Sequence, residues 1–245
     1  MKPLLSALLL CFLCVGAYAA DTLKVMSYNV RNAKGMDDIT DYQRIADVIL
    51  KEKPDAVAIQ ELDSVTKRSG GVDVLREIAR LTSMNSAYNA SIDFDGGKYG
   101  IGVIAREKPL GYYAVALPGR EEKRSLLIVE FEKYLLGCTH FSLTDEDRLL
   151  SVEIIHGEAV RASKPFILAG DLNSHPESDV IKRLKENFTM LNNTLIPTFP
   201  ADKARQCIDY IAISKNVPFT LIENKVPDER VASDHRPVII VIALN

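Results

Sequence analysis

Polar side chains able to bind a metal or move a proton interrupt the apolar segments of this chain at their ends. They are carboxylates, amides and imidazoles: Asn29, Glu61, His140, Asp171, Asn173, Asp209, Asp234 and His235. A single Asp or Asn in such a place is explained by a turn, where these residues bond their own backbone. A recurring set is not, because charged groups beside apolar segments are costly unless they are paired or metal-bound. The pattern therefore predicts that the set converges on one cleft.

The residue types in this set favour a hard divalent cation over zinc. The chain has four histidines and neither a His-x-x-x-His nor a Cys-x-x-Cys spacing, so a tetrahedral zinc site is poorly supported. Carboxylate and amide oxygens suit Mg²⁺, with Mn²⁺ as the alternative, and both ions commonly meet substrate phosphates. The pair Asp234-His235, with Asp209 elsewhere in the chain, is the composition of an imidazole base oriented by a carboxylate. No Gly-x-Ser-x-Gly segment supplies a serine nucleophile, so water is the expected nucleophile.

Short β-branched segments predict the strands that position these side chains. The segments are Leu23–Val30, Ala56–Gln60, Gly102–Ala105, Leu126–Phe131, Leu135–Thr139, Phe166–Ala169, Ile208–Ile213 and Val238–Ala243. The part of the chain between Ser86 and Thr139 is expected to be a run of strands. Apolar residues at helical spacing predict helices around 45–49, 74–78 and 149–159, and a short fourth one around 182–185. This order fits two sheets packed face to face with helices outside, an α/β sandwich.

Taken in order, the motifs resemble those of the endonuclease/exonuclease/phosphatase superfamily. They are Ser27-Tyr28-Asn29-Val30-Arg31, Gln60-Glu61, Tyr99-Gly100, Thr139-His140, Gly170-Asp171-Leu172-Asn173, Ile208-Asp209-Tyr210-Ile211 and Ser233-Asp234-His235-Arg236-Pro237. The resemblance implies the deoxyribonuclease-I-like fold, a four-layered α/β sandwich of two mixed, mostly antiparallel β-sheets flanked by helices.

The resemblance also implies roles for single residues. Glu61 matches the principal metal carboxylate, with Asn29 and Asp234 as further direct or water-mediated ligands. Asp171 and Asn173 match residues that orient the attacking water and the phosphoryl group. The catalytic histidine and its carboxylate match His235 and Asp209, the second histidine of the deoxyribonuclease-I-like and sphingomyelinase-like branches matches His140, and a phosphate-contacting hydroxyl matches Tyr99.

The mechanism expected from these roles is in-line attack of water on a phosphate ester. The metal neutralises a non-bridging oxygen while His140 and Asn173 stabilise the developing charge. Which of His235 and Asp171 takes the proton of the water stays open. Arg31 and Arg205 stand next to site motifs and are candidates for phosphate contact.

The beginning of the chain has the layout of a secretory signal peptide. Lys2 precedes an apolar run from Leu4 to Val15, and Ala17-Tyr18-Ala19 follows. We therefore expect a signal peptide over residues 1–19, cleavage near Ala19/Ala20, and a secreted or periplasmic protein whose residues 20–245 form one catalytic domain. After cleavage only Cys138 and Cys207 remain, which allows at most one disulfide.

Composition leaves the substrate open. A net charge of −3 argues against tight binding of duplex nucleic acid, which usually requires a basic excess. We expect a phosphate ester, with a phosphodiester favoured; nucleic acid, phosphoinositide, sphingomyelin or a small phosphodiester would all serve. The alternatives are a phosphomonoesterase, a sphingomyelinase-like lipid phosphodiesterase, and a non-catalytic binding protein of the same fold. Since the chain lacks tryptophan and is 7% aromatic, we expect no stable membrane association. We also expect a monomer.

Overall fold

The computed structural model describes residues 22–244. The strands are β1 (Thr22–Asn29), β2 (Ala56–Ser64), β3 (Asn85–Phe94), β4 (Gly97–Ala105), β5 (Gly111–Leu117), β6 (Arg124–Glu130), β7 (Leu135–His140), β8 (Phe166–Asp171), β9 (Phe188–Met190), β10 (Asp209–Ser214), β11 (Phe219–Lys225) and β12 (Val238–Leu244). The helices are η1 (Arg31–Ala33, a 3₁₀ turn), α1 (Tyr42–Glu52), α2 (Val74–Thr82), α3 (Asp145–Arg161) and α4 (Asp179–Asn187). The predicted signal peptide, residues 1–19, lies outside the described residues, so its cleavage stays a prediction.

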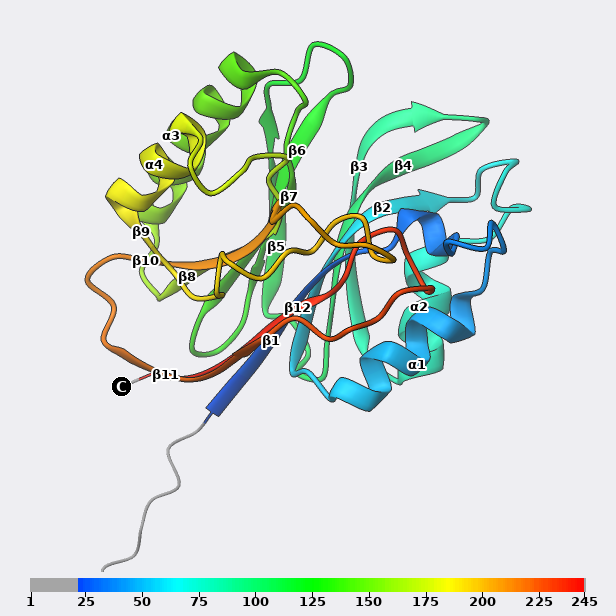
Figure 1. Ribbon diagram of the computed structural model, residues 1–245, viewed down its shortest axis with the longest axis horizontal. Coiled ribbons are helices and arrows are strands. Elements are labelled where there is room, and N and C mark those ends of the chain that lie inside the picture. The colour runs from blue at the N-terminus through cyan, green and yellow to red at the C-terminus, as the bar shows by residue number, and fades with distance from the viewer. Residues whose placement is uncertain (1–21, 245) are drawn as a thin grey trace, which may run out of the picture.

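The strands form two six-stranded mixed sheets, and the expected α/β sandwich is confirmed. Their orders are β11-β12-β1-β2-β4-β3 and β5-β6-β7-β8-β10-β9. β1 with β2 and β7 with β8 are parallel pairs, whereas the other neighbours run antiparallel. Figure 1 shows α1 and α2 outside the first sheet, and α3 and α4 outside the second.

Side-chain alternation explains why the central strands appear in the sequence as continuous apolar segments. Successive residues of a strand point to opposite faces of its sheet. In β1, Val25 belongs to the core between the two sheets, while Met26 packs into the core beneath α1 and α2. In β6, Leu127 and Ile128 divide in the same way between the inter-sheet core and the core beneath α3 and α4. Both faces of each strand are buried, so polar residues are left for the strand ends.

Side-chain caps fix where three helices begin. Asp41 accepts a hydrogen bond from the Arg44 backbone at the start of α1, and Asp73 accepts one from the Arg76 backbone at the start of α2. Ser178 caps α4 in the same way. Such caps satisfy N–H groups that have no partner inside the helix.

Within residues 22–244, no helix is both long and apolar enough to cross a membrane.

Candidate active site

Strand register brings the predicted catalytic residues together. Asp171 ends β8, where it stands opposite His140 at the end of parallel β7 and opposite Asp209 at the start of antiparallel β10. The loop before β12 brings His235 to the same place, since Ala201 N–H donates to the Asp234 carbonyl and Arg236 N–H donates to the Thr198 carbonyl. The site therefore lies where two parallel strands and one antiparallel strand end side by side.

A buried imidazole between two carboxylates forms the centre of the site. His235 Nδ1 lies 2.9 Å from Asp209 Oδ2, a hydrogen bond, and His235 Nε2 lies 3.7 Å from Asp171 Oδ2. The Phe199 ring packs against the imidazole at a centroid distance of 4.8 Å. All three polar residues are at least 96% buried by relative exposure. Asp209 thus fixes the orientation of the imidazole, whose other nitrogen is directed at Asp171.

The charges of this centre follow from burial and proximity. Burial alone would lower the pKa of His235, but the carboxylates of Asp209 and Asp171 outweigh that effect and raise it to about 10. Burial, together with the nearby Asp209, raises the pKa of Asp171 to about 7. At neutral pH His235 is therefore an imidazolium, while Asp171 is balanced between its acid and its carboxylate.

Asn29 joins the first sheet to this centre. Its Nδ2 donates to Glu61 Oε1 at 2.9 Å and to Asp171 Oδ2 at 3.1 Å. Its Oδ1 accepts from the Arg31 backbone N–H at 3.1 Å. The amide nitrogen, rather than the oxygen expected of a metal ligand, thus faces the two carboxylates. Asn29 holds Glu61 and Asp171 on opposite sides of one amide group.

His140 is paired with an arginine that the sequence did not single out. Arg124 Nη1 lies 3.1 Å from His140 Nδ1, and both side chains are buried. A guanidinium only donates hydrogen bonds, so His140 Nδ1 must accept and its proton must reside on Nε2. That nitrogen lies 3.5 Å from Asp171 Oδ2. Burial, with the positive charges of Arg124 and His235 nearby, holds the pKa of His140 well below its usual value, so His140 is a neutral donor.

Three further predicted residues lie at the wall of the site. Asn173 has a left-handed backbone (φ 46°), its N–H donates to Asp171 Oδ1 at 2.9 Å, and its Nδ2 donates to the Phe141 carbonyl at 3.0 Å. Burial and the nearby Glu61 raise the pKa of Tyr99, so its hydroxyl stays protonated. The side chain of Asp234 is 26% exposed and lies 3.6 Å from Arg31 Nε.

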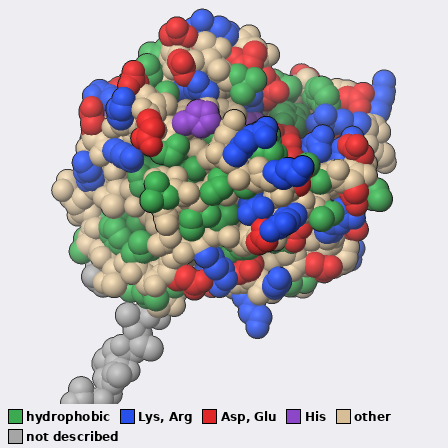
Figure 2. All heavy atoms as spheres, viewed as in Figure 1, with side chains coloured by type: hydrophobic (Ala, Val, Ile, Leu, Met, Phe, Trp, Pro, Cys, Tyr) green, Lys and Arg blue, Asp and Glu red, His purple; other side chains and the backbone are tan. Residues whose placement is uncertain are grey.

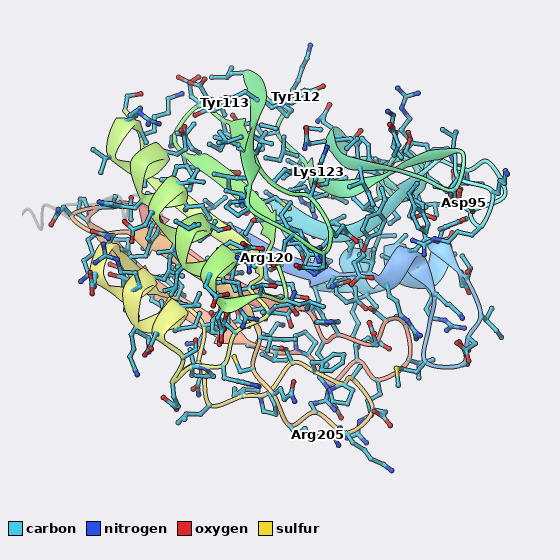
Figure 3. The ribbon with its side chains drawn as sticks, turned by 90° about the horizontal axis from the view of Figure 1, so that it is seen from above. Asp95, Tyr112, Tyr113, Arg120, Lys123 and Arg205 are labelled. Carbon is cyan, nitrogen blue, oxygen red and sulfur yellow. The ribbon has the colours of Figure 1, made fainter. Side chains whose placement is uncertain are left out.

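These groups surround a pocket of about 400 Å³. Its lining is Glu61, Tyr99, Glu122, Arg124, His140, Leu143, Asp171, Asn173, His175, Phe199, Gln206, Ile208, Asp234 and His235. Figure 2 shows a histidine at the edge of the surface hollow between the two halves of the molecule, with Lys and Arg side chains gathered beside it. Asn29 and Asp209 support this lining from behind as buried residues. Arg31 lines a neighbouring pocket, whereas Arg205 is exposed and points away from the molecule (Figure 3).

Comparison with known families identifies the chain. Residues 26–235 match the model of the "Endonuclease/Exonuclease/phosphatase family". The chain belongs to this family. It is therefore a hydrolase that acts on phosphate esters, and the resemblance seen in its motifs is confirmed.

Solved structures agree with this family on the fold. An endonuclease/exonuclease/phosphatase from Beutenbergia cavernae superposes with a TM-score of 0.74 at 24% identity, over 91% of this chain and 72% of that chain. A mannosyl-6-phosphatase from Bacteroides thetaiotaomicron gives 0.72 at 18% identity, over 90% and 99%. The human Nocturnin catalytic domain with a bound sulfate anion gives 0.69 at 18% identity, over 91% and 95%. At these identities the likeness concerns the fold alone.

The donor set of this family member fits a divalent cation. Ligand atoms of Asp171, Asp209 and His235 lie within 4.8 Å of one another, and the two carboxylates are the groups able to hold a cation, because His235 is protonated and bonded to Asp209. Among residues 22–244, Asp209 Oδ1 is buried without a hydrogen-bond partner, and burial disfavours the charged form of Asp171. A cation would relieve both costs, because buried carboxylates are stable only when paired or metal-bound. Glu61 lines the same pocket and accepts from the Asn29 amide that also bonds Asp171, so it is a further carboxylate for the ion.

Arg124, Glu122 and Phe199 are among the site residues that the sequence did not single out. Arg124 begins the apolar strand β6 and its side chain is only 7% exposed, with Glu122 Oε1 at 2.9 Å from Nη1. An arginine in front of a strand as apolar as Ser-Leu-Leu-Ile-Val is costly to bury without a function. A charged residue directly before an apolar segment was therefore the feature of the sequence that could have revealed Arg124.

Proposed function

We propose that the protein is an exported, metal-dependent phosphodiesterase that hydrolyses its substrate by in-line attack of water. The observation that carries the proposal is the buried Asp209–His235 pair directed at Asp171 on the floor of the pocket. A structural ion pair needs no second carboxylate at 3.7 Å from the free imidazole nitrogen, whereas a proton-transfer site does.

The proton of the attacking water is assigned to Asp171. A general base works best when its pKa is close to the working pH, and in the metal-free protein the pKa of Asp171 is raised to about 7, with its Oδ2 at 3.5 Å from His140 Nε2 and 3.7 Å from His235 Nε2. His235, with a pKa raised to about 10, already carries its proton and serves as a fixed positive charge and hydrogen-bond donor. Asp209 keeps that charge in place.

Neutral donors in the pocket lining stabilise the charge that develops on the phosphoryl oxygens. His140 presents Nε2–H because Arg124 occupies its Nδ1, and Tyr99 presents a protonated hydroxyl. Donors held in place before the reaction need no reorganisation in the transition state. Arg124 lines the same pocket and adds a permanent positive charge.

Glu61 is the proposed anchor of the cation, with Asn29 holding its carboxylate and Asp234 completing the rim. Oxygen ligands of this type favour Mg²⁺ or Mn²⁺. When bound, the ion would neutralise a non-bridging phosphoryl oxygen. Asn29→Asp tests the arrangement, since it replaces the amide between Glu61 and Asp171 by a third carboxylate.

Charge in the pocket favours a diester over a monoester. The lining holds the four carboxyl groups of Glu61, Glu122, Asp171 and Asp234 against two cations, Arg124 and His235. A monoester dianion meets more repulsion in such a pocket than a singly charged diester does. Phosphomonoester hydrolysis is the second candidate, because one structural relative is named a mannosyl-6-phosphatase. A non-catalytic binding protein of the same fold is the third candidate.

The proposal also includes export, which the signal-peptide-like residues 1–19 support, and a monomeric state.

Hydrolysis of matched aryl esters tests the proposal. We expect the wild type to hydrolyse bis(4-nitrophenyl) phosphate faster than 4-nitrophenyl phosphate with Mg²⁺ or Mn²⁺, and to lose this activity after chelation. His235→Ala should lose the activity, whereas His156→Ala, on the partly exposed face of α3, should keep it. Unchanged turnover by His235→Ala or by chelated protein would refute the mechanism. Plasmid DNA, RNA, a phosphoinositide and sphingomyelin, assayed in parallel, rank the substrate classes.

A further inference from the structure

A second pocket adjoins the catalytic pocket across Glu61. It measures about 480 Å³ and is lined by Arg31, Asn32, Lys34, Thr40, Glu61 and Arg68. Glu61 lines both pockets, so a group bound in one lies next to a group bound in the other. The catalytic pocket is rich in carboxylates, whereas this one contains three cationic side chains and one carboxylate. We call it the basic pocket.

Arg68 is held rigidly at the wall of the basic pocket. Its Nε and Nη2 donate to the two oxygens of Asp63 at 2.6 and 2.7 Å, and the Asp63 side chain is fully buried. Its guanidinium carbon also lies 4.4 Å from the Phe94 ring centroid and 5.5 Å from that of Tyr99. The side chain is nevertheless 46% exposed. A guanidinium fixed on one edge and open on the other is prepared to receive an anion without loss of side-chain entropy.

The floor of the basic pocket is a strained piece of backbone. Arg31, Asn32 and Ala33 have φ values of 46°, 52° and 58°, three successive left-handed residues without a glycine. Such conformations are unfavourable for residues with a Cβ and concentrate at functional sites. Asn32 is 9% exposed, and among residues 22–244 its Oδ1 has no hydrogen-bond partner. The strained turn places Arg31, Asn32 and Lys34 in the lining of one pocket.

We propose that the basic pocket binds a second phosphate group of the substrate, next to the phosphodiester that is cleaved. The inference rests on the proposed phosphodiesterase function and narrows its substrate class. Arg31, Lys34 and Arg68 are each paired with a carboxylate, Asp234, Asp38 and Asp63 respectively, but remain 36–46% exposed. Their remaining N–H groups can donate to a phosphate, whereas a quaternary ammonium accepts no hydrogen bond, so a choline headgroup is disfavoured. The second phosphate has two sources, a neighbouring nucleotide or a phosphorylated inositol.

Two matched substrate pairs test the inference and separate these sources. The nucleotide pair compares TpT with pTpT and TpTp, and the inositol pair compares glycerophosphoinositol with its 4-phosphate. We expect the extra phosphate to raise kcat/KM about tenfold in one pair, mainly through KM, as a charged hydrogen bond would. Enhancement in the nucleotide pair assigns a nucleic acid source, and enhancement in the inositol pair assigns a phosphoinositide source. A ratio near one in both pairs overturns the inference while leaving the phosphodiesterase function intact.

Variants locate the effect in the basic pocket. Lys34→Ala and Arg68→Gln should bring the enhancement ratio toward one. Arg68→Gln also leaves Asp63 buried without its cation, so the double variant Asp63→Asn/Arg68→Gln is the second test, with thermal unfolding to verify the fold. Lys182→Ala is the matched control, because Lys182 is an exposed lysine paired with Asp179 as Lys34 is paired with Asp38. An undiminished ratio in both Lys34→Ala and the double variant would disprove the assignment.

Binding provides a readout that needs no turnover. Titration calorimetry compares thymidine 3′,5′-bisphosphate with thymidine 5′-monophosphate in the presence of Mg²⁺. We expect the bisphosphate to bind about tenfold more tightly to the wild type and to lose most of that advantage in Lys34→Ala. If no diester is hydrolysed, the phosphodiesterase proposal fails while this comparison still decides the subsite. Equal affinities for the two nucleotides would overturn it.

Discussion

One hydrogen bond defines the charge state of the catalytic imidazole. His235 Nδ1 meets Asp209 Oδ2 at 2.9 Å, and this carboxylate is the leading cause that raises the pKa of His235 against the effect of burial. Asp209→Asn keeps the size of the side chain and removes its charge. We expect kcat on bis(4-nitrophenyl) phosphate to fall by about 10²–10⁴-fold with little change in KM.

Steady-state kinetics check this expectation against Asp202→Asn as control. Asp202 is an exposed aspartate in the loop that precedes β10, and its Oδ1 accepts a hydrogen bond from the Lys203 backbone N–H. Its variant should keep the wild-type kcat. Equal kcat for Asp209→Asn and wild type would show that His235 needs no carboxylate to act.

Arg124 selects the tautomer of His140. Its guanidinium lies 3.1 Å from His140 Nδ1, which places the imidazole proton on Nε2, facing Asp171. Arg124→Gln removes the permanent charge, so we expect kcat to fall by about 10²-fold, the usual effect of losing one donor to a developing oxyanion. Arg124→Lys should recover part of the rate because it restores the charge without the planar geometry.

Nitrogen chemical shifts of His140 distinguish this role from a purely structural one. The wild type should show a protonated Nε2 and an unprotonated Nδ1, and Arg124→Gln should show a mixture of the two tautomers. A His140 that carries a proton on Nδ1 in the wild type would contradict the assignment.

Sequence reasoning reached single residues whose type is unusual for their place, and missed those whose partner is remote. Asp209 and His235 stand at the ends of apolar segments, which made them visible as candidates. Arg124 has the same character, but its role depends on His140 in the neighbouring strand, which a linear pattern does not contain. The structure also turns the nitrogen of Asn29 toward Glu61, an orientation that depends on Asp171 across the sandwich.

At the scale of elements, the central strands were predictable and the edge strands were not. β9 and β11 correspond to no predicted segment, and β3 and β5 fell only within the general run between Ser86 and Thr139. These four strands are the edges of the two sheets. An edge strand has less to bury, as in β11, where five successive residues are exposed, so its sequence lacks an apolar segment.

The spacing of β7 and β8 controls how His140 meets Asp171. Gly170 of β8 stands opposite Thr139 of β7, and a Cβ built on it would lie 2.1 Å from the Thr139 carbonyl oxygen. Gly170→Ala must therefore push the two strands apart, at a cost of about 1–3 kcal/mol in unfolding free energy. Since His140 and Asp171 are the next residues of these strands, we expect kcat to fall as well.

Urea unfolding and kcat, measured on the same samples, test this expectation. Gly157→Ala in α3 is the matched control, because its Cβ would meet only the Arg161 side chain, at 3.6 Å. That variant should gain about 0.5–1 kcal/mol from helix propensity and keep its activity. A Gly170→Ala protein as stable and active as the wild type would mean that the strands separate without cost to the site.

At the scale of the whole molecule, the active site exists only when the two sheets are packed together. β1 and β2 of the first sheet supply Asn29 and Glu61, while β7, β8 and β10 of the second supply His140, Asp171 and Asp209. The bond from Asn29 to Asp171 spans 142 positions of the chain. Sequence predicted that the residues converge, but the distances between them depend on how two sheets pack, which no local pattern records.

Assembling these charges makes the stability of the whole molecule depend on pH. The pKa of Asp171 is raised from 3.8 to about 7, and that of His235 from 6.5 to about 10. In both cases the folded protein binds a proton that the unfolded chain releases, so the free energy of unfolding falls as pH rises. For Asp171 the stabilisation is complete below its unfolded pKa and is lost through about 7, and for His235 it is lost through about 10.

We therefore expect metal-free protein to lose stability between about pH 6.5 and pH 9, measured as urea midpoints in chelator, because below this range the lowered pKa of His140 acts in the opposite direction. Asp171→Asn removes one of the two titrating groups, so its midpoint should exceed that of the wild type at the alkaline end and change less with pH. Mg²⁺ should restore the wild type at the alkaline end, because an ion that binds only the folded state stabilises it by mass action. If the stability of the wild type in chelator stays constant or rises over this range, Asp171 and His235 do not have the raised pKa values on which this prediction rests.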